Sequence, residues 1–226
     1  TPARGSEVLK VNRMAASVFK VSDVTEARRA IGLPGVRGIL HPMPMTDPLL
    51  IHALACHQVT RRTALGPFEL EHGNRAFAHA STAIRDHLAR FGFSSARVRS
   101  AFAAEVLRTL EFFVELLQDR NVEYRIRFIP REAQESRPHY DYTALSLVRT
   151  FLGPGTWVHQ SSKRRFQVAP SDLLILKGTA FPAGSRKEAL LHDYPAGNEP
   201  SASASGRVVV IARTMTWNGG GSHDAV

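Results

Sequence analysis

The hydrophobic pattern of this 226-residue chain changes its period once, near Asn121. Upstream, apolar residues recur every three or four positions, which is the spacing of one face of an α-helix. Downstream, apolar and polar residues alternate, as they do on a β-strand with one buried face. The alternation begins at residues 122–129, whose sequence is VEYRIRFI. The pattern therefore predicts an α+β fold, with a helical N-terminal half and a β-rich C-terminal half.

Three helices are expected in the first half. A Thr-Asp-Pro run at 46–48 provides an N-cap and a proline in the first turn. A second helix is expected to begin near Asn74 and to end before Gly92, which supplies a C-terminal stop. The serine pair at 94–95 can cap a third, long helix. Residues 1–120 are therefore expected to form a mainly helical support region.

The second half predicts short strands that are separated by Gly and Pro, a pattern typical of an antiparallel sandwich or barrel. A Gly-Pro-Gly turn is expected at 153–155, after a strand at 142–152. A polar loop is expected at 198–205, and residues 218–226 are expected to form a flexible tail. After the strand at 122–129, strands are expected at 142–152, 156–160, 164–168, 172–177, 189–192 and 206–214.

The composition limits the class of protein. Apolar residues make up 43% and charged residues 22% of the chain, ordinary proportions for a packed single domain at 1–226. No apolar run approaches the roughly 18 residues of a membrane-spanning helix, and the first residues lack the apolar segment of a secretory signal. The single cysteine, Cys56, excludes an internal disulfide and any multi-cysteine zinc site. We therefore expect a cytoplasmic protein without a membrane partner, in which Cys56 is buried.

The chain is strongly basic, with 29 Lys and Arg against 20 Asp and Glu and a formal net charge of +9. Such a charge can attract nucleic acid, but the arginines occur in short pairs and never in a run interleaved with aromatic residues. The pattern therefore does not favour nucleic-acid binding. A small molecule that carries carboxylate or phosphate groups matches the same charge.

One group of residues in the β half has the composition of a metal site. His139 and Asp141 lie two positions apart at the entrance of a predicted strand, so their side chains project to the same face. His192 ends another predicted strand. Two imidazoles and one carboxylate form the facial triad of non-haem Fe(II) oxygenases, which leaves coordination positions open. Arg207 begins the last apolar strand, where its planar guanidinium can hold a carboxylate through two hydrogen bonds.

Each of these residues also has an ordinary structural interpretation. The His-X-Asp pair can form a turn in which the Asp side chain bonds its own backbone. His192 can be a surface residue at a strand end, and His159, on another predicted strand, is the main alternative for the third ligand. Arg207 can mark an exposed strand start. Arg213 shares its face in a regular strand and is the alternative carboxylate anchor.

A His-X-Asp pair, a distant His and an Arg on the final strand, in this order, resemble the Fe(II)/2-oxoglutarate-dependent dioxygenase superfamily. The resemblance implies that His139, Asp141 and His192 bind Fe(II) and form the catalytic centre. It implies that Arg207 pairs with the far carboxylate of the co-substrate 2-oxoglutarate. Dioxygen and a small-molecule substrate are the other expected partners, with hydroxylation as the usual outcome.

The same resemblance predicts the fold and its boundaries. It covers about residues 122–216 and implies a double-stranded β-helix (jelly-roll, cupin-like) core at 121–217, on which the helical half packs. Within this region, residues 149–156 (RTFLGPGT) and 176–178 (LKG) look like a bacterial family of domains of unknown function.

Two other functions fit the same residues. One is a non-catalytic jelly-roll protein that binds a metal or a partner, for instance in metal homeostasis. The other is a cupin-like iron oxygenase that uses the triad without an oxoacid, for which Arg207 is dispensable. Turnover of 2-oxoglutarate to succinate in the presence of Fe(II) distinguishes the 2-oxoglutarate-dependent oxygenase from these two alternatives.

Overall fold

The structure is a computed structural model that describes seven segments of the chain. The tail at 218–226 and most of the polar segment at 198–205 lie outside these segments, so both remain predictions from sequence. The described segments are residues 18–70, 74–118, 122–133, 137–161, 164–182, 187–196 and 205–217.

The described α-helices all lie in the N-terminal half, as expected, and one three-residue 3-10 helix, Arg131–Ala133, lies in the second half. Three of the four α-helices were predicted from sequence, and the first of them is capped by Asp47, whose carboxylate accepts the amide N–H groups of Leu49 and Leu50 at 2.9 and 3.0 Å. The short first helix was not predicted, although Asp23 caps it. The helices are α1 (Val24–Ile31), α2 (Pro48–Cys56), α3 (Asn74–Arg90) and α4 (Ala96–Leu117).

The described strands form two sheets. The larger has the order β1-β2-β8-β5-β10-β4-β3 and is antiparallel except for the β1–β2 pair, and the smaller has the order β7-β6-β9. The strands are β1 (Val18–Lys20), β2 (Gly38–His41), β3 (Thr63–Leu70), β4 (Val122–Ile129), β5 (Leu145–Leu152), β6 (Trp157–Ser161), β7 (Arg164–Gln167), β8 (Leu173–Lys177), β9 (His192–Asp193) and β10 (Arg207–Thr214).

Three strands in the first half were not predicted from sequence. β2 is a four-residue segment with little alternation, and β3 is interrupted by Gly66 and Pro67, so neither shows a clear period of two. β3 pairs with β4, and β2 pairs with β8, so both edges of the large sheet come from the mainly helical half. The two halves of the chain therefore share one sheet.

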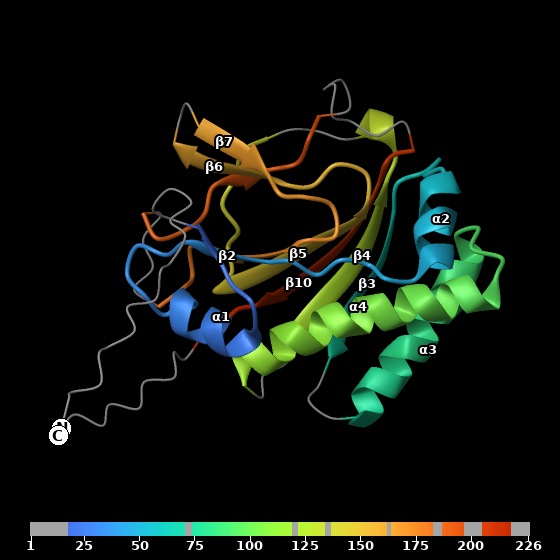
Figure 1. The fold of residues 1–226 in the computed structure, drawn as a ribbon, viewed down its shortest axis with the longest axis horizontal. Coiled ribbons are helices and arrows are strands. Elements are labelled where there is room, and N and C mark those ends of the chain that lie inside the picture. The colour runs from blue at the N-terminus through green and yellow to red at the C-terminus, as the bar shows by residue number, and fades with distance from the viewer. Residues whose placement is uncertain are drawn as a thin grey trace, which may run out of the picture.

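The two sheets and the helices form layers (Figure 1). α4 runs across one face of the large sheet, whereas β6 and β7 lie on its other side. Tyr124 and Val210 belong to the apolar cluster that includes the helices, while Val209 belongs to a second cluster that includes Val158 of β6. The result is an antiparallel jelly-roll with helices packed on its large sheet, which confirms the expected α+β fold.

Cys56 is exposed at the end of α2, contrary to expectation. The helix buries the face that carries Leu50 and Leu54, and Cys56 lies on another face. In the described part of the chain, none of the helices has both the length and the apolarity that crossing a membrane requires.

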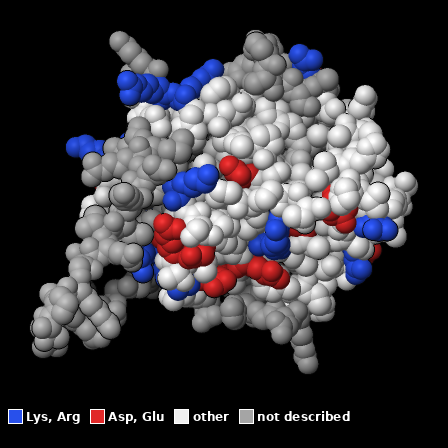
Figure 2. Space-filling model, viewed as in Figure 1, with Lys and Arg blue, Asp and Glu red and all other residues white. Residues whose placement is uncertain are grey.

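On the face seen in Figure 2, basic and acidic side chains are intermingled rather than separated.

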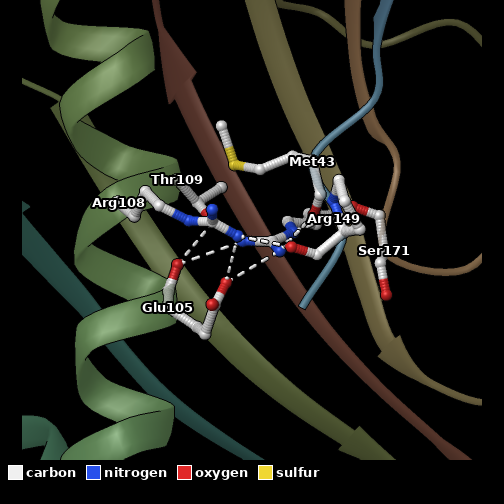
Figure 3. A network of polar contacts seen from close by, with 7 residues as sticks. Met43, Glu105, Arg108, Thr109, Arg149 and Ser171 are labelled. Atoms are coloured by element: carbon white, nitrogen blue, oxygen red, sulfur yellow. Dashed lines mark hydrogen bonds and ion pairs between the residues drawn. The ribbon is translucent and has the colours of Figure 1, made fainter. Parts of the chain in front are cut away.

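A buried arginine on β5 ties α4 to the sheet (Figure 3). Arg149 has no exposed surface and donates to the carboxylate of Glu105 at 2.9 Å and to the hydroxyl of Thr109 at 2.7 Å. It also donates to the carbonyl groups of Met43 and Ser171, at 2.6 and 3.0 Å. Burial lowers the pKa of Arg149 to about 10, which Glu105 opposes, so the guanidinium stays charged at neutral pH.

We expect Arg149→Met to lower the free energy of unfolding by about 3–5 kcal/mol, because it leaves a buried carboxylate and buried carbonyls without their donor. Arg108 contacts the same Glu105 oxygen at 2.7 Å but is 41% exposed. Arg108→Met should therefore cost only about 0–1 kcal/mol. Urea unfolding followed by circular dichroism measures both. Equal losses in the two variants would show that the buried network does not hold α4 to the sheet.

Candidate metal centre

A short backbone contact places two of the candidate ligands side by side. His139 and His192 form an isolated antiparallel bridge, in which each amide N–H donates to the other residue's carbonyl, at 2.9 and 3.1 Å. Their ring centroids are 4.4 Å apart. Residues far apart in sequence therefore present their imidazoles from adjacent segments at the edge of the small sheet.

Asp141 completes the cluster. Its Oδ1 lies 3.7 Å from Nε2 of His139 and 3.7 Å from Nε2 of His192, and one ligand atom from each residue lies within 4.8 Å of the others. The two 3.7 Å separations are less than twice a metal–ligand bond of about 2.0–2.2 Å, so an ion can bridge these atoms. The structure thus brings together the three residues that sequence analysis selected.

The backbone of Asp141 is held by the turn that follows β8. The Thr179 amide donates to the Asp141 carbonyl at 2.8 Å, and the Gly178 amide donates to the Ala144 carbonyl at 3.1 Å. A Cβ on Gly178 would overlap the carbonyl oxygen of Thr143. The glycine of the LKG motif is therefore what permits this turn to approach the aspartate segment so closely.

Hydrogen bonds orient both imidazoles. The Nδ1–H of His192 donates to the Leu190 carbonyl at 3.1 Å, and that of His139 donates to the Arg137 carbonyl at 2.8 Å. In a neutral imidazole whose Nδ1–H donates to a backbone carbonyl, Nε2 is the nitrogen with the lone pair available to a metal. Nε2 of His192 is buried, and none of the described residues forms a hydrogen bond with it. Burial lowers the pKa of His192, which favours the neutral form that binds metals.

His159, the alternative third ligand, lies elsewhere. Its Nε2 contacts Oδ2 of Asp193 at 3.3 Å, across the β6–β9 pairing of the small sheet. It is not part of the three-residue cluster. The geometry therefore favours His192 over His159.

Arg207 is buried close to this cluster. It has no exposed surface, and its NH2 group donates to the hydroxyls of Thr150 and Thr156 at 3.0 and 2.9 Å. Its guanidinium carbon lies 4.5 Å from the centroid of the Tyr194 ring. Burial lowers the pKa of Arg207 to about 10, so it remains a cation at neutral pH. Its Nε and NH1 atoms are buried and have no hydrogen-bond partner among the described residues.

Arg213, the alternative anchor, is not in an equivalent position. It is 42% exposed, and its NH2 group contacts the Glu123 carboxylate at 2.6 Å. A side chain that already has an acidic partner in a solvated position gains little from a second carboxylate. The structure therefore favours Arg207 as the anchor.

Two cavities adjoin the cluster. They share Arg127, His139 and Tyr194, and only the smaller one reaches Arg207. The smaller, of about 230 Å³, is lined by Arg62, Arg127, Ile129, Ala133, Arg137, His139, Tyr194 and Arg207. The larger, of about 410 Å³, is lined by Ala64, Glu123, Arg125, Arg127, His139, Asp141, Tyr142, Thr143, Ser146, Tyr194, Ile211 and Arg213.

Sequence analysis did not identify Arg125, Arg127 or Tyr194 as site residues. The two arginines were interpreted as the solvated face of a half-buried strand, but that face lines the larger cavity. Arg127 also forms a side-chain hydrogen bond with Tyr194, whose pKa burial raises. Alternation identified the face of β4 without showing what lies opposite it.

Comparison with known families gives one match. The sequence pattern of a family described as "Protein of unknown function (DUF1826)" matches residues 58–211 of this chain. A search of curated proteins found no match. The expectation of a family of unknown function is confirmed.

Comparison with solved structures identifies the fold. The crystal structure of the dioxygenase for auxin oxidation from rice has a TM-score of 0.51 and 13% identity, over 90% of this chain and 84% of that chain. A putative oxygenase from Shewanella oneidensis has a TM-score of 0.49 and 10% identity, over 90% of this chain and 91% of that chain. A dioxygenase for auxin oxidation from Arabidopsis thaliana, in a binary complex with 2-oxoglutarate, has a TM-score of 0.45 and 15% identity, over 90% of this chain and 93% of that chain. The rice structure shows that this chain has the fold of that dioxygenase.

We expect His192→Ala to weaken the binding of Fe(II) roughly 100-fold or more, because removing one of three ligands leaves the ion poorly held. His139→Ala and Asp141→Ala should do the same, while the fold remains largely intact. His159→Ala is the matched control and should bind Fe(II) like the unaltered protein. Anaerobic calorimetric titration measures all four. Loss of binding in His159→Ala, with full affinity in His192→Ala, would reassign the third ligand.

Proposed function

The chain belongs to the DUF1826 family of proteins of unknown function, and from the geometry of its site we propose that it is a non-haem Fe(II)- and 2-oxoglutarate-dependent oxygenase that hydroxylates a small molecule. His139, Asp141 and His192 would hold the metal. Arg207 would hold the far carboxylate of the oxoacid.

The observation that carries this proposal is that Arg207 is fully buried and that none of its described partners carries a negative charge. A guanidinium with no exposed surface is costly to bury unless an anion compensates its charge. Its described partners are two hydroxyls and an aromatic ring, which are neutral. Two of its nitrogen atoms lack a partner among the described residues, and it lines a cavity that also reaches His139. The charge and the geometry suit a carboxylate whose other end reaches the metal.

The donor set of the triad and a buried nitrogen of His192 likewise fit a bound metal ion. Nε2 of His192 is a buried atom without a hydrogen-bond partner among the described residues, and a lone pair in that position suits a metal ion. The donor set of two imidazole nitrogens and one carboxylate oxygen suits Fe(II) and leaves coordination positions open. The residues present therefore fit both the ion and the oxoacid.

When bound, Fe(II) and 2-oxoglutarate would supply the oxidation, in which one dioxygen converts the oxoacid to succinate and carbon dioxide and a substrate C–H group to C–OH. The chain's own residues orient and shelter these groups. Carbonyl groups of residues 137 and 190 fix the two imidazoles. Thr150 and Thr156 hold the Arg207 guanidinium in place before the oxoacid binds, which reduces the reorganisation that binding requires.

We expect Arg207→Ala to weaken 2-oxoglutarate binding by about 30-fold to several thousand-fold, which corresponds to about 2–5 kcal/mol for truncating a buried charge pair. Arg207→Lys should recover part of this loss, because one ammonium group cannot reproduce the planar fork. Fe(II) affinity should stay nearly unchanged in both variants. Anaerobic titrations with Fe(II) and then with 2-oxoglutarate provide the measurements.

Arg213→Ala is the control, because Arg213 pairs with Glu123 away from the buried cation. It should bind 2-oxoglutarate like the unaltered protein. Conversion of 2-oxoglutarate to succinate, measured alongside, separates an oxygenase from a non-catalytic metal-binding protein. Normal oxoacid binding in both Arg207→Ala and Arg213→Ala would refute the dependence on 2-oxoglutarate and favour the cupin-like alternative.

A further inference from the structure

Arginine side chains outnumber carboxylates in the described lining of the two cavities beside the triad. This lining includes arginines at 62, 125, 127, 137, 207 and 213 but only two carboxylates, Glu123 and Asp141. Asp141 would bind the metal. The remaining carboxylate is shared, because a single Oε1 of Glu123 contacts Arg125 at 3.1 Å and Arg213 at 2.6 Å.

Four of these arginines stand along one face of a strand pair. Residues 207 and 213 of β10 lie on the same face, and across the register Arg127 is opposite Val209 and Arg125 is opposite Ile211. Positions two residues apart on a strand are about 7 Å apart. Arg127, on the neighbouring strand β4, is therefore one such step along the sheet and one strand across from Arg207, and Arg125 is two steps along and one strand across.

An oxoacid held as proposed leaves Arg127 without an anionic partner among the residues that the structure describes. One carboxylate of 2-oxoglutarate would bind the metal and the other would pair with Arg207. Arg127 forms a side-chain hydrogen bond with Tyr194, whose phenol is neutral at neutral pH. Arg127 lines both cavities, as does His139. Arg125, Arg213 and Asp141 line only the larger one.

Resting on the proposed function, we propose that the larger cavity takes the molecule to be oxidised, and that this molecule is a small anion with a carboxylate or phosphate group recognised by Arg127. Arg125 and Arg213 would stand at the outer end of the same row. A volume of about 410 Å³ lies within the usual range of small-molecule sites. A guanidinium in a sheltered cavity binds either anion through paired hydrogen bonds.

The test measures binding in a protein that cannot turn over. The full chain is loaded with Mn(II) and N-oxalylglycine, an unreactive analogue of 2-oxoglutarate, so that the metal and Arg207 are occupied. It is then titrated calorimetrically with 3-phenylpropanoate and with phenyl phosphate, each against a neutral counterpart, 3-phenylpropanamide and phenol. The two anions distinguish a carboxylate from a phosphate as the recognised group.

We expect one or both anions to bind and the neutral counterparts to bind at least about tenfold more weakly. Arg127→Gln should weaken the anion about 10- to 100-fold, as expected for the loss of a charge-assisted hydrogen bond. Its affinity for N-oxalylglycine should change much less than that of Arg207→Ala. Arg85→Gln, on the exposed side of α3, is the matched control for net charge and should bind like the unaltered protein.

Three results would overturn the inference while leaving the proposed function standing: no anion binding to the loaded protein, equal binding of neutral counterparts, or unchanged affinity in Arg127→Gln. Loss of N-oxalylglycine binding in Arg127→Gln as severe as in Arg207→Ala would assign Arg127 to the oxoacid instead. If Mn(II) and N-oxalylglycine do not bind at all, the proposed function fails. The same titrations of the metal-free protein then decide whether the arginine row binds anions by itself.

Discussion

The pairing of β10 with both β4 and β5 is the constraint on which the rest of the structure depends. These strands lie in the middle of the large sheet, and side chains on each strand alternate between its two faces. One face carries apolar side chains that pack against α4. The other carries Arg207 and Arg213 of β10 and Arg125 and Arg127 of β4, which line the cavities. The same alternation thus builds a hydrophobic core and a basic binding face.

Two arginines with no exposed surface show how differently a buried cation can be used. Arg149 reaches a carboxylate, a hydroxyl and several carbonyl groups, and its charge is compensated inside the protein. Arg207 reaches two hydroxyls and an aromatic ring, and part of its guanidinium has no partner among the described residues. The first arrangement stabilises the fold. The second is poised for a ligand, because an anion supplied from outside would complete its contacts.

The sequence motifs that resemble a family of unknown function have physical roles here. In RTFLGPGT, the arginine ties β5 to α4, and both threonines hold Arg207. A Cβ on Gly155 would overlap the Val168 carbonyl, so the turn between the threonines needs a glycine. In LKG, Gly178 allows the turn after β8 to approach the Asp141 segment. Both motifs therefore position groups of the candidate site.

The sequence by itself determined the change from helices to strands, three of the four described α-helices, and the residue types of the candidate site, because periodicity, caps and ligand chemistry are local properties. It did not determine β1, β2 or β3, whose short or interrupted patterns become strands only through pairing with the large sheet. Sequence analysis selected His192 and Arg207 but kept His159 and Arg213 as alternatives. Tertiary structure favours the selected pair, because which imidazole faces Asp141 and which guanidinium is buried beside a cavity depend on segments far apart in the chain.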